Sequence, residues 1–96
     1  MAGRIPRLSS TVKRTLARLG VDQRSARYRA LFTTITSLSH AAYLPGAADF
    51  ETRFHPGYVH VRRVRGFNLW ILYRFDGMFV DVMTVHDEPP PPVDRE

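Results

Sequence analysis

The chain has 96 residues, of which 44% are hydrophobic and 24% charged, a balance that excludes a disordered chain and predicts one hydrophobic core. It contains no cysteine, which excludes a disulfide scaffold, and its histidine spacing does not suit a metal site, so we expect neither a metal nor a cofactor. Thirteen of its fourteen basic residues are arginine, and the net charge of +5 favours an anionic partner such as RNA, DNA or an acidic protein.

No segment approaches the roughly 18 consecutive apolar residues of a membrane helix, and the opening residues lack the apolar stretch of a secretory signal. We therefore expect a cytoplasmic protein without a membrane partner.

The first elements are predicted to be a short strand and a helix. Residues 4–8 alternate in hydropathy, and Pro6 is tolerable there only at a sheet edge or a strand start. Ser9 or Ser10 offers a side chain that can cap the helix, and Gly20 ends it. The apolar positions at helical spacing are Val12, Leu16 and Leu19.

A second helix is predicted to follow at once. Asp22 can cap it, and helical spacing of apolar residues continues for roughly four turns. These residues are Tyr28, Leu31, Phe32, Ile35 and Leu38. Because only Gly20 and Val21 separate the two patterns, we expect a tight helix hairpin.

The second half of the chain is predicted to form strands after an irregular loop. Residues His40 to Pro56 lack periodicity and contain proline and glycine, which indicates a loop. Three segments with an apolar period of two follow, at Tyr58–Val64, Leu69–Phe75 and Met78–His86. The pattern predicts an α+β fold in which the helix hairpin packs on one face of a four-stranded sheet. The sheet would consist of the N-terminal strand and a three-stranded antiparallel meander.

The dipeptide Asp76-Gly77 is predicted to join the last two strands in a two-residue turn, because it supplies the positive φ angles that such turns require. With Phe75 opposite Met78, one face of the hairpin is a core face, which carries Leu69, Ile71, Tyr73, Phe75, Val80, Val82 and Thr84. The other face is both apolar and charged, which indicates a partner. It carries Trp70, Leu72, Arg74, Phe79, Asp81, Met83 and Val85, and Asp81 is expected to pair with Arg74.

Two turns are possible before residue 69. A three-residue turn at residues 66–68 directs Val59 and Val61 into the core and leaves His60 and Arg62 on the partner face. A two-residue turn at Arg65-Gly66 would bury His60 and Arg62, so we prefer the longer turn.

The proline run Pro89 to Pro92 cannot donate backbone hydrogen bonds and is expected to leave the sheet. We therefore predict one domain at residues 1–88 and a proline-rich tail at residues 89–96. A polyproline ligand for an aromatic groove is the alternative for the tail.

The length and the element order resemble the RelE/ParE toxin superfamily of type II toxin–antitoxin systems. The most telling stretch is LWILYRFDG at residues 69–77 followed by MFVDVMTVH at residues 78–86, which is similar to the family's pattern of hydrophobic strand, YR, turn and second hydrophobic strand. The resemblance covers residues 4–88. It implies a bacterial toxin that inhibits growth and is masked by a bound antitoxin. RelE-like members cut mRNA on the ribosome and ParE-like members poison DNA gyrase, so the resemblance leaves open whether the chain is an enzyme.

The chain departs from the RelE-like pattern where RNA would be cleaved. His60 and Arg62 match the basic pair on the first meander strand, but Trp70 takes the place of an arginine, and Asp87 and Glu88 take the place of a basic cluster. The family's late tyrosine is absent too. These departures favour a binding poison or an altered ribonuclease.

The sequence offers three sets of candidate site residues. The candidate catalytic set is His60, Arg62, Arg74 and His86, since phosphodiester transfer needs a base, an acid and a cation; the alternative is ordinary surface residues. The candidate partner-binding residues are Trp70, Leu72, Phe79, Met83 and Val85, and Trp70 would either anchor the antitoxin or stack on a base. The candidate nucleic-acid or target-binding residues are Arg62, Arg63 and Arg65, with a solvated strand edge as the alternative. A non-toxic interaction module and a nucleic-acid-binding domain are the alternative functions.

Overall fold

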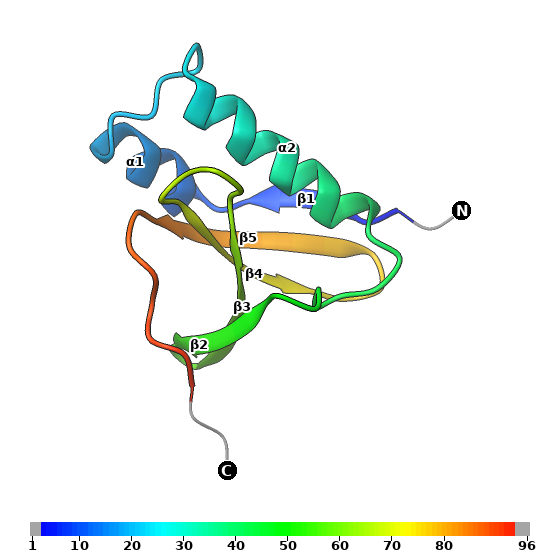
Figure 1. The fold of residues 1–96 in the computed structure, drawn as a ribbon. Coiled ribbons are helices and arrows are strands. Elements are labelled where there is room, and N and C mark those ends of the chain that lie inside the picture. Colours follow the sequence, from blue (N-terminus) through cyan, green and yellow to red (C-terminus); the bar gives the residue numbers. More distant parts are fainter. Residues whose placement is uncertain (1–2, 94–96) are drawn as a thin grey trace.

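The computed structural model describes residues 3–93, in which two helices lie on one face of a five-stranded sheet (Figure 1). The elements in chain order are β1 (Ile5–Leu8), α1 (Ser10–Arg18), α2 (Ala26–His40), β2 (Phe50–Phe54), β3 (Gly57–Arg63), β4 (Trp70–Phe75) and β5 (Phe79–His86). The predicted α+β class and the two helices are confirmed.

The sheet has the strand order β1-β5-β4-β3-β2. The strands from β2 to β5 form an antiparallel meander, and β1 lies at the edge opposite β2, where it is parallel to β5. The meander therefore has one strand more than predicted.

The additional strand β2 lies where the sequence pattern predicted only a loop. Phe50, Thr52 and Phe54 alternate with charged residues, and the strand pairs with β3 from Phe50 opposite Val61 to Phe54 opposite Gly57. The prediction of irregular chain through Pro56 was wrong from Phe50 onward, because a strand this short depends on its neighbour and carries little signal of its own.

The two helices begin and end at residues of the expected types, but not all at the expected positions. Ser9 is the N-cap residue of α1, but its hydroxyl donates to Met83 O at 2.6 Å and does not cap the helix as predicted; Gly20 has a positive φ of 69° just beyond the helix end. For α2 the predicted cap Asp22 was wrong. Ser25 caps this helix, and its Oγ accepts a hydrogen bond from the backbone N–H of Tyr28 at 3.1 Å. The link between the helices is therefore longer than the predicted tight turn.

The main core fills the space between the helices and the sheet. From the helices it takes Val12, Leu16, Leu31, Ile35 and Leu38, and from the strands and loops it takes Val21, Val64, Leu69, Ile71, Tyr73, Val80, Val82 and Val85. Each such side chain stabilises the fold by about 1.5–3 kcal/mol through removal from water. We call this side of the sheet the helix-covered face and the other side the outer face.

The β4–β5 hairpin is closed by Asp76, but not in the predicted register. Phe75 lies opposite Val80 rather than Met78, and Gly77 does not adopt a positive φ. The Asp76 carboxylate instead accepts hydrogen bonds from the backbone N–H groups of Met78 and Phe79, each at 2.7 Å, and so stabilises the turn through its side chain.

A register shift in this hairpin moves the end of β5 to the other face. Tyr73 pairs with Val82 but Leu72 pairs with Thr84, so Met83 is an additional residue in β5. As a result Val85 lies in the main core and Thr84 lies beside Leu72 on the outer face, the reverse of the prediction for both.

The preferred turn between β3 and β4 was also wrong. The backbone N–H of Val64 donates to Leu69 O at 2.8 Å, so four residues form the loop instead of three. This change of parity exchanges the two faces of β3. His60 and Arg62 lie on the helix-covered face, and Val59 and Val61 lie on the outer face.

The outer face has a small core of its own. Val59, Val61 and Leu72 are buried there, and the partly buried residues around them are Phe50, Phe54, Trp70 and Met83. The chain after β5 returns beside β2 (Figure 1), where the Thr52 hydroxyl donates to Pro91 O at 2.7 Å and Val93 N–H donates to Glu51 O at 2.8 Å. The described part of the proline-rich tail, up to Val93, is thus docked on the domain, and residues 94–96 lie outside the described residues.

Neither helix among residues 3–93 has the length and apolar character needed to cross a membrane.

Candidate functional site

Arg62 projects from the helix-covered face of β3 toward the segment that follows α2, where it meets the buried carboxylate of Asp49. Arg62 donates from Nε to Asp49 Oδ1 at 2.9 Å and from Nη2 to Asp49 Oδ2 at 3.0 Å. The Asp49 side chain is 2% exposed and the Arg62 side chain is 23% exposed. The contact is a bidentate ion pair largely shielded from water, the strongest geometry available to these two groups.

Two further groups donate to the same carboxylate. Asp49 Oδ2 accepts a hydrogen bond from Gly46 N–H at 2.8 Å and a short one from the Tyr73 hydroxyl. A Cβ atom at Gly46 would lie 2.0 Å from Nη2 of Arg62, so a side chain at this position would displace the guanidinium from Asp49. Asp49 therefore ties the segment at residues 46–49 to both β3 and β4.

The electrostatics follow from this arrangement. The hydrogen bond to Asp49 raises the pKa of Arg62 further above its ordinary value. Burial, followed by the hydrogen bond to Asp49, raises the pKa of the Tyr73 hydroxyl well above its ordinary value. Arg62 is thus held charged, Tyr73 is held neutral, and the guanidinium edge that a phosphate would need is already occupied by a carboxylate.

The other candidate catalytic residues lie elsewhere. The His60 ring packs against the rings of Tyr73 and Phe75, with centroids 5.5 and 5.3 Å apart. Arg74 is on the outer face of β4 and donates to the backbone carbonyls of Phe54 and Tyr58, both at 3.1 Å. It closes the turn between β2 and β3, which is a structural role.

His86 lies at the end of β5, opposite Trp70 and on the outer face. It lines a pocket of about 430 Å³ between β2 and the docked tail, together with Thr52, Phe54, Leu72 and the prolines at positions 90–92. Because His60 and Arg62 face the helix-covered side while Arg74 and His86 face the outer side, the four candidate residues do not surround one site.

The candidate partner-binding residues divide into two groups. Leu72 and Val85 are buried within the domain, so their side chains are not available to a partner in this conformation. Trp70, Phe79 and Met83 are half-buried and lie on the outer face, with Trp70 toward one end of it and Phe79 toward the other. This face therefore offers a smaller apolar surface than the sequence pattern indicated.

The candidate nucleic-acid-binding arginines are likewise divided. Arg62 is paired with Asp49, whereas Arg63 and Arg65 are exposed. The Arg63 guanidinium lies over the Trp70 ring, 5.6 Å from its centroid, and donates to Phe67 O at 3.3 Å. Arg63 and Trp70 thus present one mixed cationic and aromatic surface at this end of the sheet.

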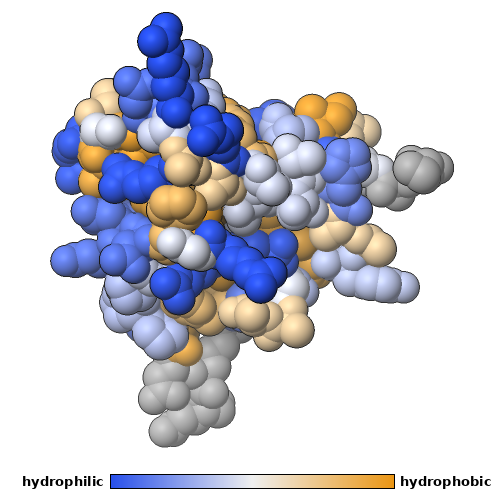
Figure 2. Space-filling view, turned by 45° about the horizontal axis from the view of Figure 1, so that its top comes forward, coloured by the Kyte–Doolittle hydropathy of each residue, from blue (hydrophilic) through white to orange (hydrophobic). Residues whose placement is uncertain are grey.

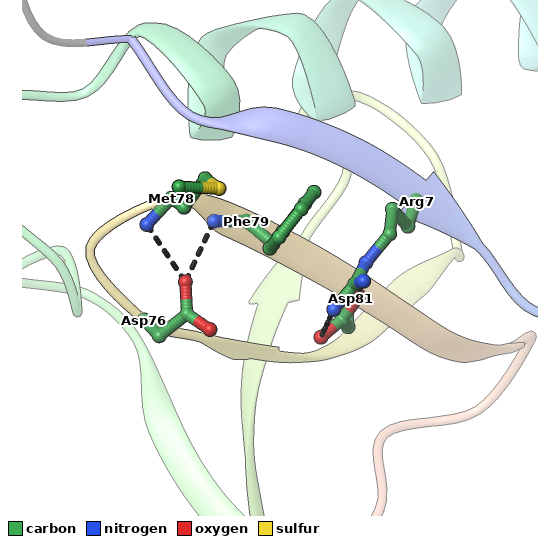
Figure 3. A network of polar contacts seen from close by, with 5 residues as sticks. All are labelled: Arg7, Asp76, Met78, Phe79 and Asp81. Atoms are coloured by element: carbon green, nitrogen blue, oxygen red, sulfur yellow. Dashed lines mark hydrogen bonds and ion pairs between the residues drawn. The ribbon is translucent and has the colours of Figure 1, made fainter.

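The opposite end of the outer face carries a second surface of the same kind (Figure 3). Arg7 of β1 lies 3.6 Å from the centroid of the Phe79 ring and forms an ion pair with Asp81 at 2.6 Å. Asp81 therefore pairs with Arg7 and not with Arg74 as expected, since parallel pairing places β1 directly beside β5. The hydrogen bond to Asp81 raises the pKa of Arg7, and the hydrogen bonds from Met78 and Phe79 lower the pKa of Asp76.

Two important residues could not be identified from local sequence patterns. Asp49 lies 13 positions from Arg62, and no local pattern links them. Gly46 follows Pro45 and is typical of any loop, so its close contact with a guanidinium becomes visible only in the folded chain.

No group of three or more histidine, aspartate or glutamate side chains within residues 3–93 is placed to hold a metal ion. The chain matches no known protein family, no characterised protein and no solved structure.

Proposed function

We propose that this chain is the toxin component of a bacterial toxin–antitoxin pair of the RelE/ParE type, held inactive by a bound antitoxin, and that it inhibits growth by binding its target rather than by cutting RNA. The observation that carries the proposal is the order and pairing of the elements. A strand, two helices and an antiparallel meander follow one another, and the first strand lies beside the last. This arrangement and the YRFDG turn support the resemblance, although the meander has an additional strand at β2.

The separation of the candidate catalytic residues supports binding over cleavage. RNA cleavage needs a base, an acid and a cation around one phosphate. Arg62 is occupied by Asp49, and His60 and His86 lie on opposite faces of the sheet. Of the two lethal acts that the resemblance implies, poisoning of DNA gyrase therefore fits the chain better than ribosome-dependent cleavage of mRNA.

The outer face is the surface that we assign to the target. Trp70 and Phe79 are half-buried aromatic side chains, and each has an arginine guanidinium over its ring. Met83 is a half-buried, flexible apolar side chain. Such side chains dominate the binding energy of protein interfaces. A protein target explains this composition better than a nucleic-acid backbone alone, which would require mostly unpaired cations.

Induced expression of the chain alone in a bacterial host tests the proposal. We expect growth arrest, loss of supercoiling in a reporter plasmid and unchanged 5′ ends of translated mRNA. Trp70→Ala should relieve the arrest, while Tyr43→Ala, which removes an aromatic ring that is 87% exposed and lies in the loop between α2 and β2, should not. The thermal stability of both purified variants controls for unfolding. Arrest accompanied by new cuts in mRNA would show the ribonuclease activity instead, and unchanged growth would show a non-toxic module.

A further inference from the structure

A groove of about 500 Å³ lies between the two helices. Its lining is mostly apolar and comes from the end of β1, from α1, from the link between the helices and from the first half of α2. The lining residues on which the argument rests are Leu8, Val12, Leu16, Ala17, Tyr28 and Phe32.

The groove exists because both helices pack on the sheet and do not pack tightly against each other. α1 packs on β5, whereas α2 packs on β1 and β5. The inner side chains Val12 and Leu16 form the floor with exposures of 0% and 7%. Leu8 at one end is 36% exposed, and the rings of Tyr28 and Phe32 form one wall with centroids 4.5 Å apart. A solvent-accessible apolar groove of this kind typically marks an interaction site.

The charge of the helical layer is strongly one-sided. Residues 9–40 contain six basic side chains and one acidic side chain, whereas the remainder of the chain contains eight of each. The helical layer thus carries the entire net charge of +5. The only acidic residue, Asp22, accepts a hydrogen bond from Arg24 N–H at 2.8 Å within the link.

These cations lack carboxylate partners in the described part of the chain. The ion pairs found among residues 3–93 are Arg7 with Asp81 and Arg62 with Asp49, and both lie outside the helical layer. Figure 2, which turns the helical side toward the reader, shows strongly hydrophilic side chains around hydrophobic ones on this face. The surface therefore combines an apolar groove with the cations of the helical layer that lack carboxylate partners, of which Lys13 lines the groove; we call these cations the positive rim.

We propose that this groove binds one amphipathic α-helix of a partner protein, with apolar residues on the buried side of that helix and glutamate or aspartate on its flanks. The groove follows α1, which has 9 residues and is about 13 Å long, and the first half of α2, so a partner helix of roughly two and a half turns spans it. A helix lying between two helices meets the apolar floor with side chains at positions i, i+3, i+4 and i+7. Its acidic flanks meet the positive rim, which increases the association rate and disfavours basic partners.

A nucleic acid is a poorer occupant. Its phosphates would satisfy the rim, but its backbone would leave the accessible apolar side chains of the groove, Leu8, Tyr28 and Phe32, without an apolar contact. The docking site is independent of the proposed growth inhibition, because a non-toxic interaction module would use it in the same way.

Binding of synthetic peptides to the full chain tests the inference by fluorescence anisotropy. The probe is an 18-residue peptide with leucine on one helical face and glutamate on the other. One control peptide has the same composition in scrambled order, and a second has lysine in place of every glutamate. We expect the amphipathic acidic peptide to bind at least about tenfold more tightly than either control.

Two pairs of variants locate the site. Ala17 is exposed and lines the groove, so Ala17→Trp fills it without removing a core side chain, and Ala26→Trp is the matched change on an exposed position outside the groove. We expect at least about tenfold weaker peptide binding for Ala17→Trp and no change for Ala26→Trp. Lys13→Glu on the rim should weaken binding by roughly fivefold, while Arg65→Glu in the β3–β4 loop should leave it unchanged.

The inference is overturned if the scrambled peptide binds equally well, or if Ala17→Trp has no effect while the purified variant keeps its thermal stability. It is also overturned if a 20-base-pair DNA duplex binds more tightly than the amphipathic peptide and loses that affinity in Lys13→Glu, because the rim would then serve a polyanion. Normal peptide binding by a chain that fails to arrest growth would leave the groove intact and refute only the proposed function.

Discussion

Removal of the Asp49 carboxylate is expected to destabilise the fold more than loss of any exposed charge. Asp49 accepts four hydrogen bonds, two from Arg62 and one each from Gly46 and Tyr73. Asp49→Ala leaves the largely buried guanidinium of Arg62, the backbone N–H of Gly46 and the buried hydroxyl of Tyr73 without their acceptor. Breaking a buried ion pair in this way costs roughly 3–5 kcal/mol, which lowers Tm by at least about 12 °C in a domain of this size.

Urea denaturation measures this loss, followed by the fluorescence of the single tryptophan and by far-UV circular dichroism. Asp81→Ala is the matched control, since it removes the exposed partner of Arg7 and should leave the midpoint close to that of the wild type. The double variant Asp49→Leu with Arg62→Met should regain most of the stability, because an apolar pair leaves no unpaired charge. Equal losses for Asp49→Ala and Asp81→Ala would refute the view that Asp49 is a shielded centre of this cluster.

Three further expectations follow from the same contacts. The pKa of Tyr73 is raised in the folded state, so the contribution of its protonated hydroxyl to the free energy of unfolding is complete below the ordinary pKa of 10.0 and is lost as the pH rises. Alkaline unfolding should therefore be less steep in Tyr73→Phe, as measured by circular dichroism from pH 9 to 12. The pKa of Asp76 is lowered in the folded state, so the contribution of its carboxylate to the free energy of unfolding is complete above the ordinary pKa of 3.8 and is lost as the pH falls. Acid titration should show a smaller loss of stability in Asp76→Ala than in the wild type. Truncation after Glu88 should uncover the small outer core and increase binding of a hydrophobic dye, whereas truncation after Val93 should have no such effect.

Much of the fold follows from local patterns in the sequence. The helical spacing in α1 and α2, the residue types at their ends and the period of two in β3 to β5 each depend on neighbouring residues. These elements were accordingly predicted in the correct order. β2 was missed because five residues with an adjacent Pro56 resemble a loop until β3 supplies their hydrogen-bond partners.

The register errors had a different physical cause. The additional residue Met83 in β5 and the four-residue loop before Leu69 are single-residue effects, and each exchanges the faces of the residues beyond it. The penalty expected for burying His60 and Arg62 favoured the three-residue turn over a turn that places both residues on the helix-covered face, which is where the chain places them. That penalty is offset by Asp49, which the sequence did not reveal as a partner.

The candidate site inherited these errors. Val85 was assigned to the partner face and Arg62 to the same face as Trp70, and both assignments depended on the predicted registers. Residues whose exposure depends less on register, such as Arg63 and Arg65 near the β3–β4 loop, lie on the surface as expected.

Growth of a bacterial host after induction of the double variant His60→Gln with His86→Gln, beside the wild-type chain, tests most directly whether the protein acts by binding rather than by RNA cleavage. The two imidazoles lie on opposite faces of the sheet, and neither is one of the three side chains, Trp70, Phe79 and Met83, on which target binding is proposed to depend, so we predict that the double variant arrests growth as the wild type does. Loss of the arrest in a double variant that keeps the thermal stability of the wild type would contradict this account and assign a catalytic role to at least one histidine.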